Sequence, residues 1–578
     1  MTIEEALSAI KNAVYGKDVR QAMHDGILQA EGGAGTVAKE AEKSAKKAEA
    51  SAKKSEIASR AIEGKADQAV TMARSANSKS DSTQLQLNEI VINGDSSVEA
   101  AQARVDIENI AHDTLKARLD KEQQEVTAQL AHEALKRTIA NDYIEYGKID
   151  ISKYAPDFPK APPFELYRDF DGKIKHTFDF DENLKYTDKI YLDFNNGAIA
   201  NDGLTESTPV RYLSDALTKA EALSTDSVEI VLMNKWLVAN LSTQDPLTQK
   251  FDINKNITLS SIHEGGTFIT SGNHGGVYTW TNDNGVYSTT RSRVEYVADY
   301  KFKDFKGLPL VYNMVGTLSE CQSNAGTWYT DGSTVWVNRL DGSIPDEDIG
   351  LGFTQNTKMY FTLYGYKFAL DNVHFWIKQL SYGFDALNIG GTSRSKLYAR
   401  NTSARFSYKR NGIAVSNIGE TYLFNSFTSE NGADGFNYHG GTHMLVFEYD
   451  CYSYGNGLVD SNRGNCTTAH GGINIIRVNT VGHDTAGPVL ADVNGCYSII
   501  FDTTMYDSLR QDEGATKAAF YFDKASAPTE AIGKAVLINC GGGGNDTFSI
   551  NSDGLIDISV KNFKGNNIPK ALQLNVLD

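Results

Sequence analysis

Cysteine, proline and long apolar runs are scarce in this chain. The 578 residues include 5 cysteines and 11 prolines. An odd number of cysteines without a CxxC pair predicts neither a disulfide framework nor a zinc site, so we expect buried free thiols. No apolar run approaches the length of a membrane span, and the first residues lack the basic and apolar regions of a signal peptide. We therefore expect a protein that is made in the cytoplasm and does not insert into a membrane.

Positive charge is also in short supply. Lysine and arginine together number 56, against 73 aspartates and glutamates, which makes the net charge −17 at pH 7. Phosphate-rich partners need clustered cations, so this balance argues against binding to nucleic acid or to anionic membranes. The sequence offers no cofactor motif and no metal-ligand spacing, and we predict neither a cofactor nor a metal site.

Small residues recur at alternating steps of four and three within residues 34–92. This repeat keeps one stripe of a helix facing a partner and predicts a long left-handed coiled coil, the stalk of an oligomeric fibre. Each alanine hides only about one methyl group, about 0.8 kcal/mol at best, so the stalk is slender and weak. A seam of Ala and Ser does not determine the number of chains. The seam consists of Ala34, Ala38, Ala41, Ala45, Ala48, Ala52, Ser55, Ser59, Ile62, Ala66, Ala69, Ala73, Ala76, Ser80, Thr83, Leu87 and Ile90.

The segments around this stalk differ in their periodicity. Residues 1–33 have helical spacing interrupted by a turn, which predicts a short helical head. Residues 93–150 begin with a capping sequence and predict a second helical coil or bundle. Residues 151–189 lose the periodicity and gain aromatic residues and four prolines, which predicts a neck between stalk and head domain.

From residue 190 to residue 578, short apolar strands alternate with polar turns that contain Asn, Gly and Asp. The first five strands start about 23 to 30 residues apart, as one coil of a parallel β-helix requires, whereas a propeller blade needs about forty residues. We therefore predict a parallel β-helix. Its strands are Lys396–Arg400, Thr421–Asn425, Met444–Glu448, Asn474–Val478, Tyr497–Phe501, Ala535–Asn539 and Ile556–Val560.

Two short motifs near the amino terminus are similar to segments of phage proteins. Residues 13–27 (AVYGKDVRQAMHDGI) resemble the attachment segment of baseplate and tail-fibre proteins from phages of Gram-positive bacteria. Residues 93–106 (NGDSSVEAAQARVD) are similar to a linker of tail appendages in the same phages. The resemblance implies a homotrimeric tail fibre or tailspike that is part of the virion and docks to baseplate proteins through residues 1–33.

Further motifs lie in the β domain. Residues 191–204 and the helix that follows resemble the entry to pectate-lyase-like right-handed β-helices, in which an amphipathic helix covers the open first coil. Residues 431–439, 466–472 and 487–493 resemble a β-helix group of phage and bacterial proteins that act on glycans. This resemblance implies a host cell-wall or capsular polysaccharide, teichoic acid included, as the partner. Gly471 stands where the resembled pattern carries Asp.

One strand carries two carboxylates. Glu448 and Asp450 lie two residues apart, hence on one face of a strand, and they point outward if the apolar residues that alternate with them point inward. Cleavage of a glycan needs paired carboxylates, or a base beside a cation. We therefore predict Glu448, Asp450 and His470 as the catalytic residues of a polysaccharide lyase or glycoside hydrolase.

Other ionisable and aromatic residues lie on the same or neighbouring coils, which stack about 4.8 Å apart and can bring side chains together. Each also has a structural alternative: Asp is common in solenoid turns, His can be packed and hydrogen-bonded, and aromatic rings fill cores by alternation. The predicted ligand-binding residues are Asp434, His439, Asp460, Arg477, Asp492 and Trp376.

Three functions are consistent with these features. A fibre that depolymerises polysaccharide needs the carboxylates and histidines to converge, whereas a fibre that only binds needs repeated shallow sugar sites and gains avidity from its copies. A secreted bacterial polysaccharide lyase is disfavoured by the stalk and by the missing signal peptide.

Overall fold

The computed structural model places the chain in two compact units, Met1–Thr138 and Ile139–Asp578. The predicted head and stalk, and all but the end of the second helical segment, lie outside the described residues, so these predictions stay untested. Apart from Leu119 and Gln123, the structure describes residues 147–577 without 239–247, 354–357, 378–383, 389–394, 459–463, 510–516, 524–532, 545–546, 553–555, 566–567 and 570–573.

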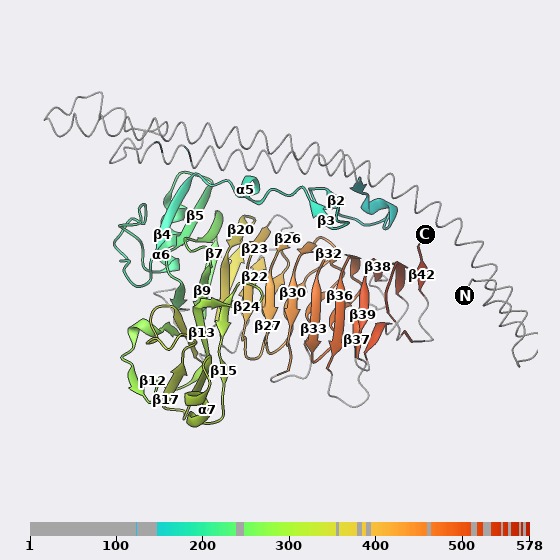
Figure 1. The fold of residues 1–578 in the computed structure, drawn as a ribbon. Helices are drawn as coiled ribbons and strands as arrows, with labels where there is room; N and C mark the ends of the chain where they lie inside the picture. The colour runs from blue at the N-terminus through green and yellow to red at the C-terminus, as the bar shows by residue number, and fades with distance from the viewer. Residues whose placement is uncertain are drawn as a thin grey trace, which may run out of the picture. The chain divides into compact units, whose positions relative to one another are not determined.

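Three parallel sheets run along the second unit and form a parallel β-helix (Figure 1). Each strand pairs in parallel with the equivalent strand of the next coil, as β26 does with β29 and β29 with β32. Sheet 1 contains β4 (Asp188–Leu192), β5 (Ser227–Leu232), β8 (Asn256–Ser261), β20 (Lys367–Asp371), β23 (Lys396–Arg400), β26 (Glu420–Phe424), β29 (Leu445–Tyr449), β32 (Asn474–Val478), β35 (Tyr497–Phe501), β38 (Lys534–Ile538), β41 (Asp557–Lys561) and β42 (Asn575–Val576).

Sheets 2 and 3 complete each coil. Sheet 2 contains β6 (Trp236–Val238), β9 (Thr267–Thr270), β21 (Val373–Trp376), β24 (Ser403–Arg405), β27 (Phe427–Ser429), β30 (Tyr452–Tyr454), β33 (Val481–Thr485), β36 (Thr504–Ser508) and β39 (Gly541–Gly543). Sheet 3 contains β7 (Thr248–Ile253), β19 (Lys358–Leu363), β22 (Phe384–Asn388), β25 (Ile413–Ser416), β28 (Phe436–His439), β31 (Thr467–His470), β34 (Leu490–Val493), β37 (Ala518–Phe522) and β40 (Phe548–Ser552). All seven predicted strands coincide with strands of sheet 1 to within one residue, which confirms the repeat found in the sequence.

Left-handed residues mark the corner between sheets 1 and 2. The residue directly after each sheet-1 strand from β20 to β41 is Asn or Asp, and its φ lies between 47° and 60°. Asn and Asp tolerate this conformation because their short side chains bond locally. The side chains also bond from coil to coil, as Asn425 does with Asn401 and Asn562 with Asn539. The column is Asn372, Asn401, Asn425, Asp450, Asn479, Asp502, Asn539 and Asn562.

A helix covers the first coil of the solenoid, as predicted. Helix α6 (Leu213–Ala222) buries Leu213, Ala216, Leu217 and Ala220 against the interior residues of the first strands. An uncovered end would leave these apolar side chains and strand edges open to water.

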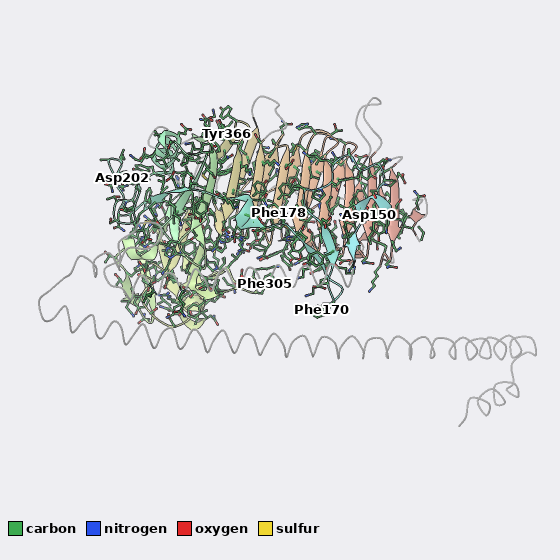
Figure 2. All side chains as sticks on the ribbon, turned by 90° about the horizontal axis from the view of Figure 1, so that it is seen from above. Asp150, Phe170, Phe178, Asp202, Phe305 and Tyr366 are labelled. Carbon is green, nitrogen blue, oxygen red and sulfur yellow. The ribbon has the colours of Figure 1, made fainter. Side chains whose placement is uncertain are left out.

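Residues 148–184 lie along the outer face of sheet 1 and do not extend away from it as a neck. They form β1 (Lys148–Ile149), the short helix η1 (Ile151–Lys153), β2 (Leu166–Arg168), β3 (Ile174–His176) and α5 (Phe180–Asn183). We call this segment the strap; Figure 2 labels Asp150, Phe170 and Phe178 along it. The Phe178 ring stacks on Tyr398, Tyr422 and Phe424 with centroids 5.7, 5.8 and 4.9 Å away. Sheet 1 is therefore covered on both faces over these coils.

A mainly antiparallel module is inserted between β9 and β19, within the range that the sequence assigns wholly to the β-helix. The module lies beside sheet 2 (Figure 1). It has its own apolar core and also packs against aromatic residues on the outer face of sheet 2. Its elements are β10 (Asn273–His274), η2 (Gly275–Val277), β11 (Thr281–Asp283), β12 (Val286–Thr290), β13 (Val294–Lys303), β14 (Pro309–Val311), β15 (Asn313–Met314), α7 (Leu318–Ser323), β16 (Thr327–Thr330), β17 (Thr334–Asn338) and β18 (Ile349–Phe353).

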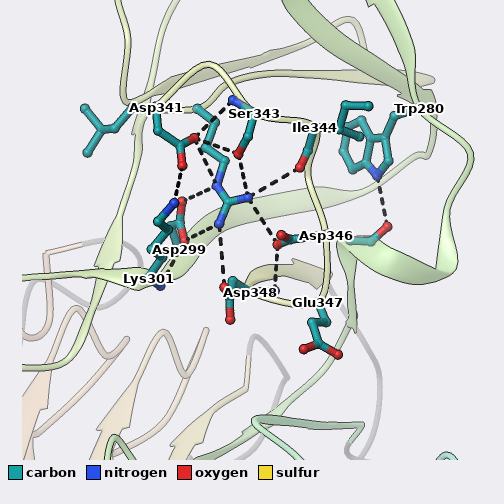
Figure 3. Close-up of polar contacts among 12 residues, drawn as sticks. Trp280, Asp299, Lys301, Asp341, Ser343, Ile344, Asp346, Glu347 and Asp348 are labelled. Carbon is teal, nitrogen blue, oxygen red and sulfur yellow. Dashed lines mark hydrogen bonds and ion pairs between the residues drawn. The ribbon is translucent and has the colours of Figure 1, made fainter.

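A buried arginine organises the polar side of this module (Figure 3). Arg339 donates two hydrogen bonds to the buried Asp299 carboxylate, at 2.8 and 3.2 Å, and lies 3.1 Å from Asp346. It also donates to the Ser343 hydroxyl at 2.9 Å. These ion pairs and hydrogen bonds offset the cost of burying the charged guanidinium.

All five cysteines are buried free thiols, as expected from their number and spacing. Within the described ranges, no helix has the length and apolarity needed to cross a membrane.

Candidate functional site

Glu448, Arg477 and Asp492 lie inside the β-helix, and the predicted outward orientation of Glu448 is wrong. The side chains of Glu448 and Arg477 have no exposed surface, and that of Asp492 is 1% exposed. Leu445, Phe447 and Tyr449 instead face the strap, because the strap offers them a second apolar surface. Carboxylates enclosed in this way cannot contact a polysaccharide in this structure, so Glu448 is not retained as an acid or base.

The three buried charges form one hydrogen-bonded network. The strand register places Glu448 beside Arg477, whose guanidinium lies 3.4 Å from the Glu448 carboxylate. Arg477 donates to both oxygens of Asp492 at 2.7 and 2.9 Å. The Tyr438 and Thr467 hydroxyls donate to Glu448 at 2.9 and 2.6 Å. These residues stabilise the interior rather than present a ligand site.

Two other predicted residues, Asp450 and Trp376, also lie apart from a shared groove. Asp450 occupies the left-handed corner column, with a φ of 53°, and accepts a hydrogen bond from Asn479. It therefore does not share a face with Glu448. Trp376 is buried beneath the inserted module and donates to the Ser403 hydroxyl at 2.9 Å, which makes it a core residue. Asp460 lies outside the described residues.

His439 and His470 do come together on the outer face of sheet 3. They end β28 and β31, which pair in register, so one imidazole lies directly above the other. The ring centroids are 4.2 Å apart and the planes differ by 3°. Alternation along each strand directs Asn437 and Thr468 to the same outer face. We call Asp434, Asn437, His439, Thr468 and His470 the histidine patch.

Hydrogen bonds order the patch. Asp434, in the turn before β28, accepts from the Asn437 amide at 2.7 Å and from the backbone and side chain of Asn465 at 2.9 Å each. The Nε2 atom of His470 lies 3.4 Å from the Asn437 amide nitrogen and 3.3 Å from the Thr468 hydroxyl. The Asn437 carbonyl oxygen is buried and has no hydrogen-bond partner among the described residues.

The electrostatics of the patch differ from those of exposed side chains. Burial, with a smaller contribution from His439, lowers the pKa of His470 to about 4. Burial also lowers the pKa of His439. Burial raises the pKa of Asp434 to about 6 against the hydrogen bonds that favour its charged form. At neutral pH the two imidazoles are uncharged, so each offers a ring N–H donor and a nitrogen acceptor to a ligand.

The sequence interpretation missed three residues of this face. Asn437 and Thr468 could have been found, because each stands two positions before a predicted histidine and so shares its face. Asp385 lies on the same outer row two coils earlier, since it pairs with Ala414, which pairs with Asn437. Burial raises the pKa of Asp385 to about 7. A single aspartate in an apolar strand carried no signal of this environment.

No cluster of three or more His, Cys, Asp or Glu with metal-site spacing occurs among the described residues. The polar groups of the patch suit hydrogen bonds to hydroxyl groups instead.

Comparison with known proteins links the chain to solved structures by shape alone. No family model matches the sequence, and no curated protein matches it. The similar structures include XylC in complex with xylose, at 10% identity over 67% of this chain and 70% of that chain, with a TM-score of 0.34. Pectate lyase Pel9A matches at 10% identity over 65% and 80%, with a TM-score of 0.34. The GH136 lacto-N-biosidase from Eubacterium ramulus matches at 11% identity over 68% of each chain, with a TM-score of 0.32. Because these scores are low, we assign the parallel β-helix from the strand pairing of this chain and not from these similarities.

Proposed function

We propose that this protein binds polysaccharide through the histidine patch on the outer face of sheet 3. The observation that carries the proposal is the stacked pair His439 and His470, linked through the Asn437 amide to the Asp434 carboxylate. Such a cluster of hydrogen-bonding groups with shifted pKa values is typical of a binding or active site.

The residues of the patch suit hydroxyl groups on a repeating chain. Neutral imidazoles donate and accept, and the Asp434 carboxylate accepts more strongly once it is ionised above pH 6. The coils repeat along the solenoid, so an extended glycan can cross several of them. Cleavage would need a second acid or base near the patch, and Asp385, two coils away on this face and with a pKa of about 7, is a candidate.

We further propose that the chain is a tail fibre or tailspike of a phage of Gram-positive bacteria. The support is the Ala and Ser seam of residues 34–92 and the two motifs at 13–27 and 93–106. In this proposal three chains form the fibre, residues 1–33 dock it to the baseplate of the virion, and the β-helix meets the cell-wall or capsular polysaccharide, or teichoic acid, of the host.

Co-sedimentation of the full-length protein with purified cell-wall polysaccharide and teichoic acid tests the proposal. We expect His439→Ala and His470→Ala to lower the affinity at least tenfold, because each removes hydrogen bonds to the glycan. His274→Ala, in the inserted module, is the matched control and should bind as the wild type does. The same mixtures are assayed for new reducing ends and unsaturated products, which would show turnover. Unchanged binding in both patch variants would contradict the proposal.

A further inference from the structure

A second ordered surface lies on the outer face of sheet 2, away from the histidine patch. Tyr454, His483 and Tyr506 are aligned by the strand register on three successive coils, β30, β33 and β36. The rings of Tyr454 and His483 are 5.3 Å apart and inclined by 6°, and those of His483 and Tyr506 are 4.8 Å apart and inclined by 10°. We call this stack the aromatic shelf.

The aromatic shelf ends at a strand without side chains. In the next coil, Gly543 is the register partner of Tyr506, and the whole of β39 is Gly541–Gly543. Within the part of the chain that the structure describes, the Tyr506 ring stacks on His483 alone. Among the described residues, the other face of this half-buried ring has no aromatic neighbour, so a flat apolar group can stack on it.

Hydrogen bonds hold the central ring in place. The Tyr452 hydroxyl donates to Nε2 of His483 at 2.6 Å, and Nδ1 of His483 donates to the Asp484 carboxylate at 2.7 Å. Both nitrogens of this imidazole are thus occupied, so the ring is fixed within the stack. A preorganised ring loses little freedom when a ligand binds.

Carboxylates border the shelf. Glu430 directly follows β27, Asp484 follows His483 in β33, and Asp507 follows Tyr506 in β36. All three have a φ between 55° and 57°. The Glu430 and Asp484 side chains are 42% and 45% exposed. Carboxylate oxygens accept hydrogen bonds from vicinal hydroxyls, whereas they repel a polyanion.

The inserted module supplies a wall on the other side. Phe305, at the turn between β13 and β14, is 69% exposed and meets the Tyr452 ring edge to face at 5.6 Å. The Lys306 ammonium lies 4.0 Å from the centre of the same ring. Figure 2 shows Phe305 on the opposite side of the molecule from Tyr366.

We propose that the aromatic shelf is a separate binding site for an uncharged glycan. One pyranose ring stacks on the open face of Tyr506, its hydroxyls donate to the bordering carboxylates, and the chain extends toward Phe305. A second copy of this protein is a poorer occupant, because it would bury the Asp484 carboxylate, which is bonded to the His483 imidazole, in an interface without an added cation. The site shares no residue with the histidine patch, so its test is independent of the proposed function.

A glycan array probed with the full-length protein tests this site. Dextran, a β-1,3-glucan and chitin oligosaccharides serve as uncharged probes, and polygalacturonate serves as the anionic probe. We expect retention of at least one uncharged glycan, a loss of at least tenfold in affinity for Tyr506→Ala and Phe305→Ala, and near wild-type affinity for Tyr506→Phe, which keeps the ring. Tyr366→Ala is the control for loss of an exposed tyrosine elsewhere.

The outcomes separate this site from the histidine patch. Loss of binding in His439→Ala but not in Tyr506→Ala would overturn the proposal for the aromatic shelf and support the histidine patch. Loss of binding in Tyr506→Ala but not in His439→Ala would support the shelf and contradict the patch. Retention of polygalacturonate alone, or of no uncharged glycan, would also overturn the proposal. So would a smaller oligomer for Tyr506→Ala in light scattering, since that result would assign the shelf to contact between copies. Thermal unfolding of each variant confirms that it is folded.

Discussion

Arg477 stabilises two carboxylates that the fold has enclosed. Glu448 and Asp492 flank its guanidinium at 3.4 and 2.7 Å, and none of the three side chains is more than 1% exposed. Removing one partner of such a set leaves charge in a medium that solvates it poorly, which costs more than the pair contributes to stability.

Replacing Arg477 with Met should therefore lower the free energy of unfolding by about 3–5 kcal/mol. Denaturation of the full-length protein by guanidinium, followed by tryptophan fluorescence, measures the change. Arg168→Met is the control, because Arg168 pairs with Asp502 while it is 33% exposed, and such surface pairs contribute about 0–1 kcal/mol. Equal effects of the two substitutions would contradict a buried network.

Asp385 should make stability depend on pH. Burial raises its pKa from 3.8 to about 7 in the folded protein. The folded state then binds more protons than the unfolded state between these values, so this carboxyl group lowers stability as the pH rises from about 4 through 7. Asp385→Asn, which cannot ionise, should be more stable than the wild type by an increment that grows from pH 4 to pH 8. Thermal unfolding across this range checks it, and a constant increment would be inconsistent with the shifted pKa.

At the scale of elements, the corner between sheets 1 and 2 depends on residues that tolerate positive φ. Asn479 has a φ of 54° and donates to Asp450 on the preceding coil. A column of such residues sets the bend after each sheet-1 strand from β20 to β41, so the turns repeat from coil to coil.

Asn479→Ala should cost about 1–2 kcal/mol from the left-handed conformation, in addition to the lost hydrogen bond. Asn479→Gly should lose only the hydrogen bond, because glycine adopts this conformation without strain. Equilibrium denaturation of both variants separates the two contributions. If the glycine variant proves the less stable, backbone conformation is not what selects Asn at this corner.

At the scale of the whole molecule, the predicted stalk should determine how many chains associate, whereas the β-helix should fold without it. Light scattering on the intact chain should report three copies. Ala45→Asp with Ala69→Asp places charges in a closely packed seam and should dissociate the oligomer, at several kcal/mol per trimer, because unpaired charge is costly to bury.

The β-helix of this double variant should melt at the wild-type temperature, since its apolar core lies within residues 190–560. Lys47→Asp, beside the seam, is the matched control and should leave the oligomer intact. A monomeric wild type at micromolar concentration would contradict the fibre proposal.

The amino-acid sequence by itself determined the repeat, seven of the twelve strands of sheet 1 and the covering helix α6. The signal was sufficient because every coil needs apolar positions at the same interval and the first coil needs a cover. His439 and His470 could likewise be brought together by counting coils, since register alone stacks them.

Only the tertiary structure decided which face of a strand is inside. Leu445–Tyr449 is buried throughout, because the interior covers one face and the strap covers the other. Alternation between apolar and polar residues then no longer predicts which side chains face inward. The position of Glu448 in the strand therefore does not distinguish it from a surface carboxylate. The inserted module escaped notice for a related reason: its short apolar strands have the composition of the β-helix strands, and only long-range pairing shows them to be mainly antiparallel.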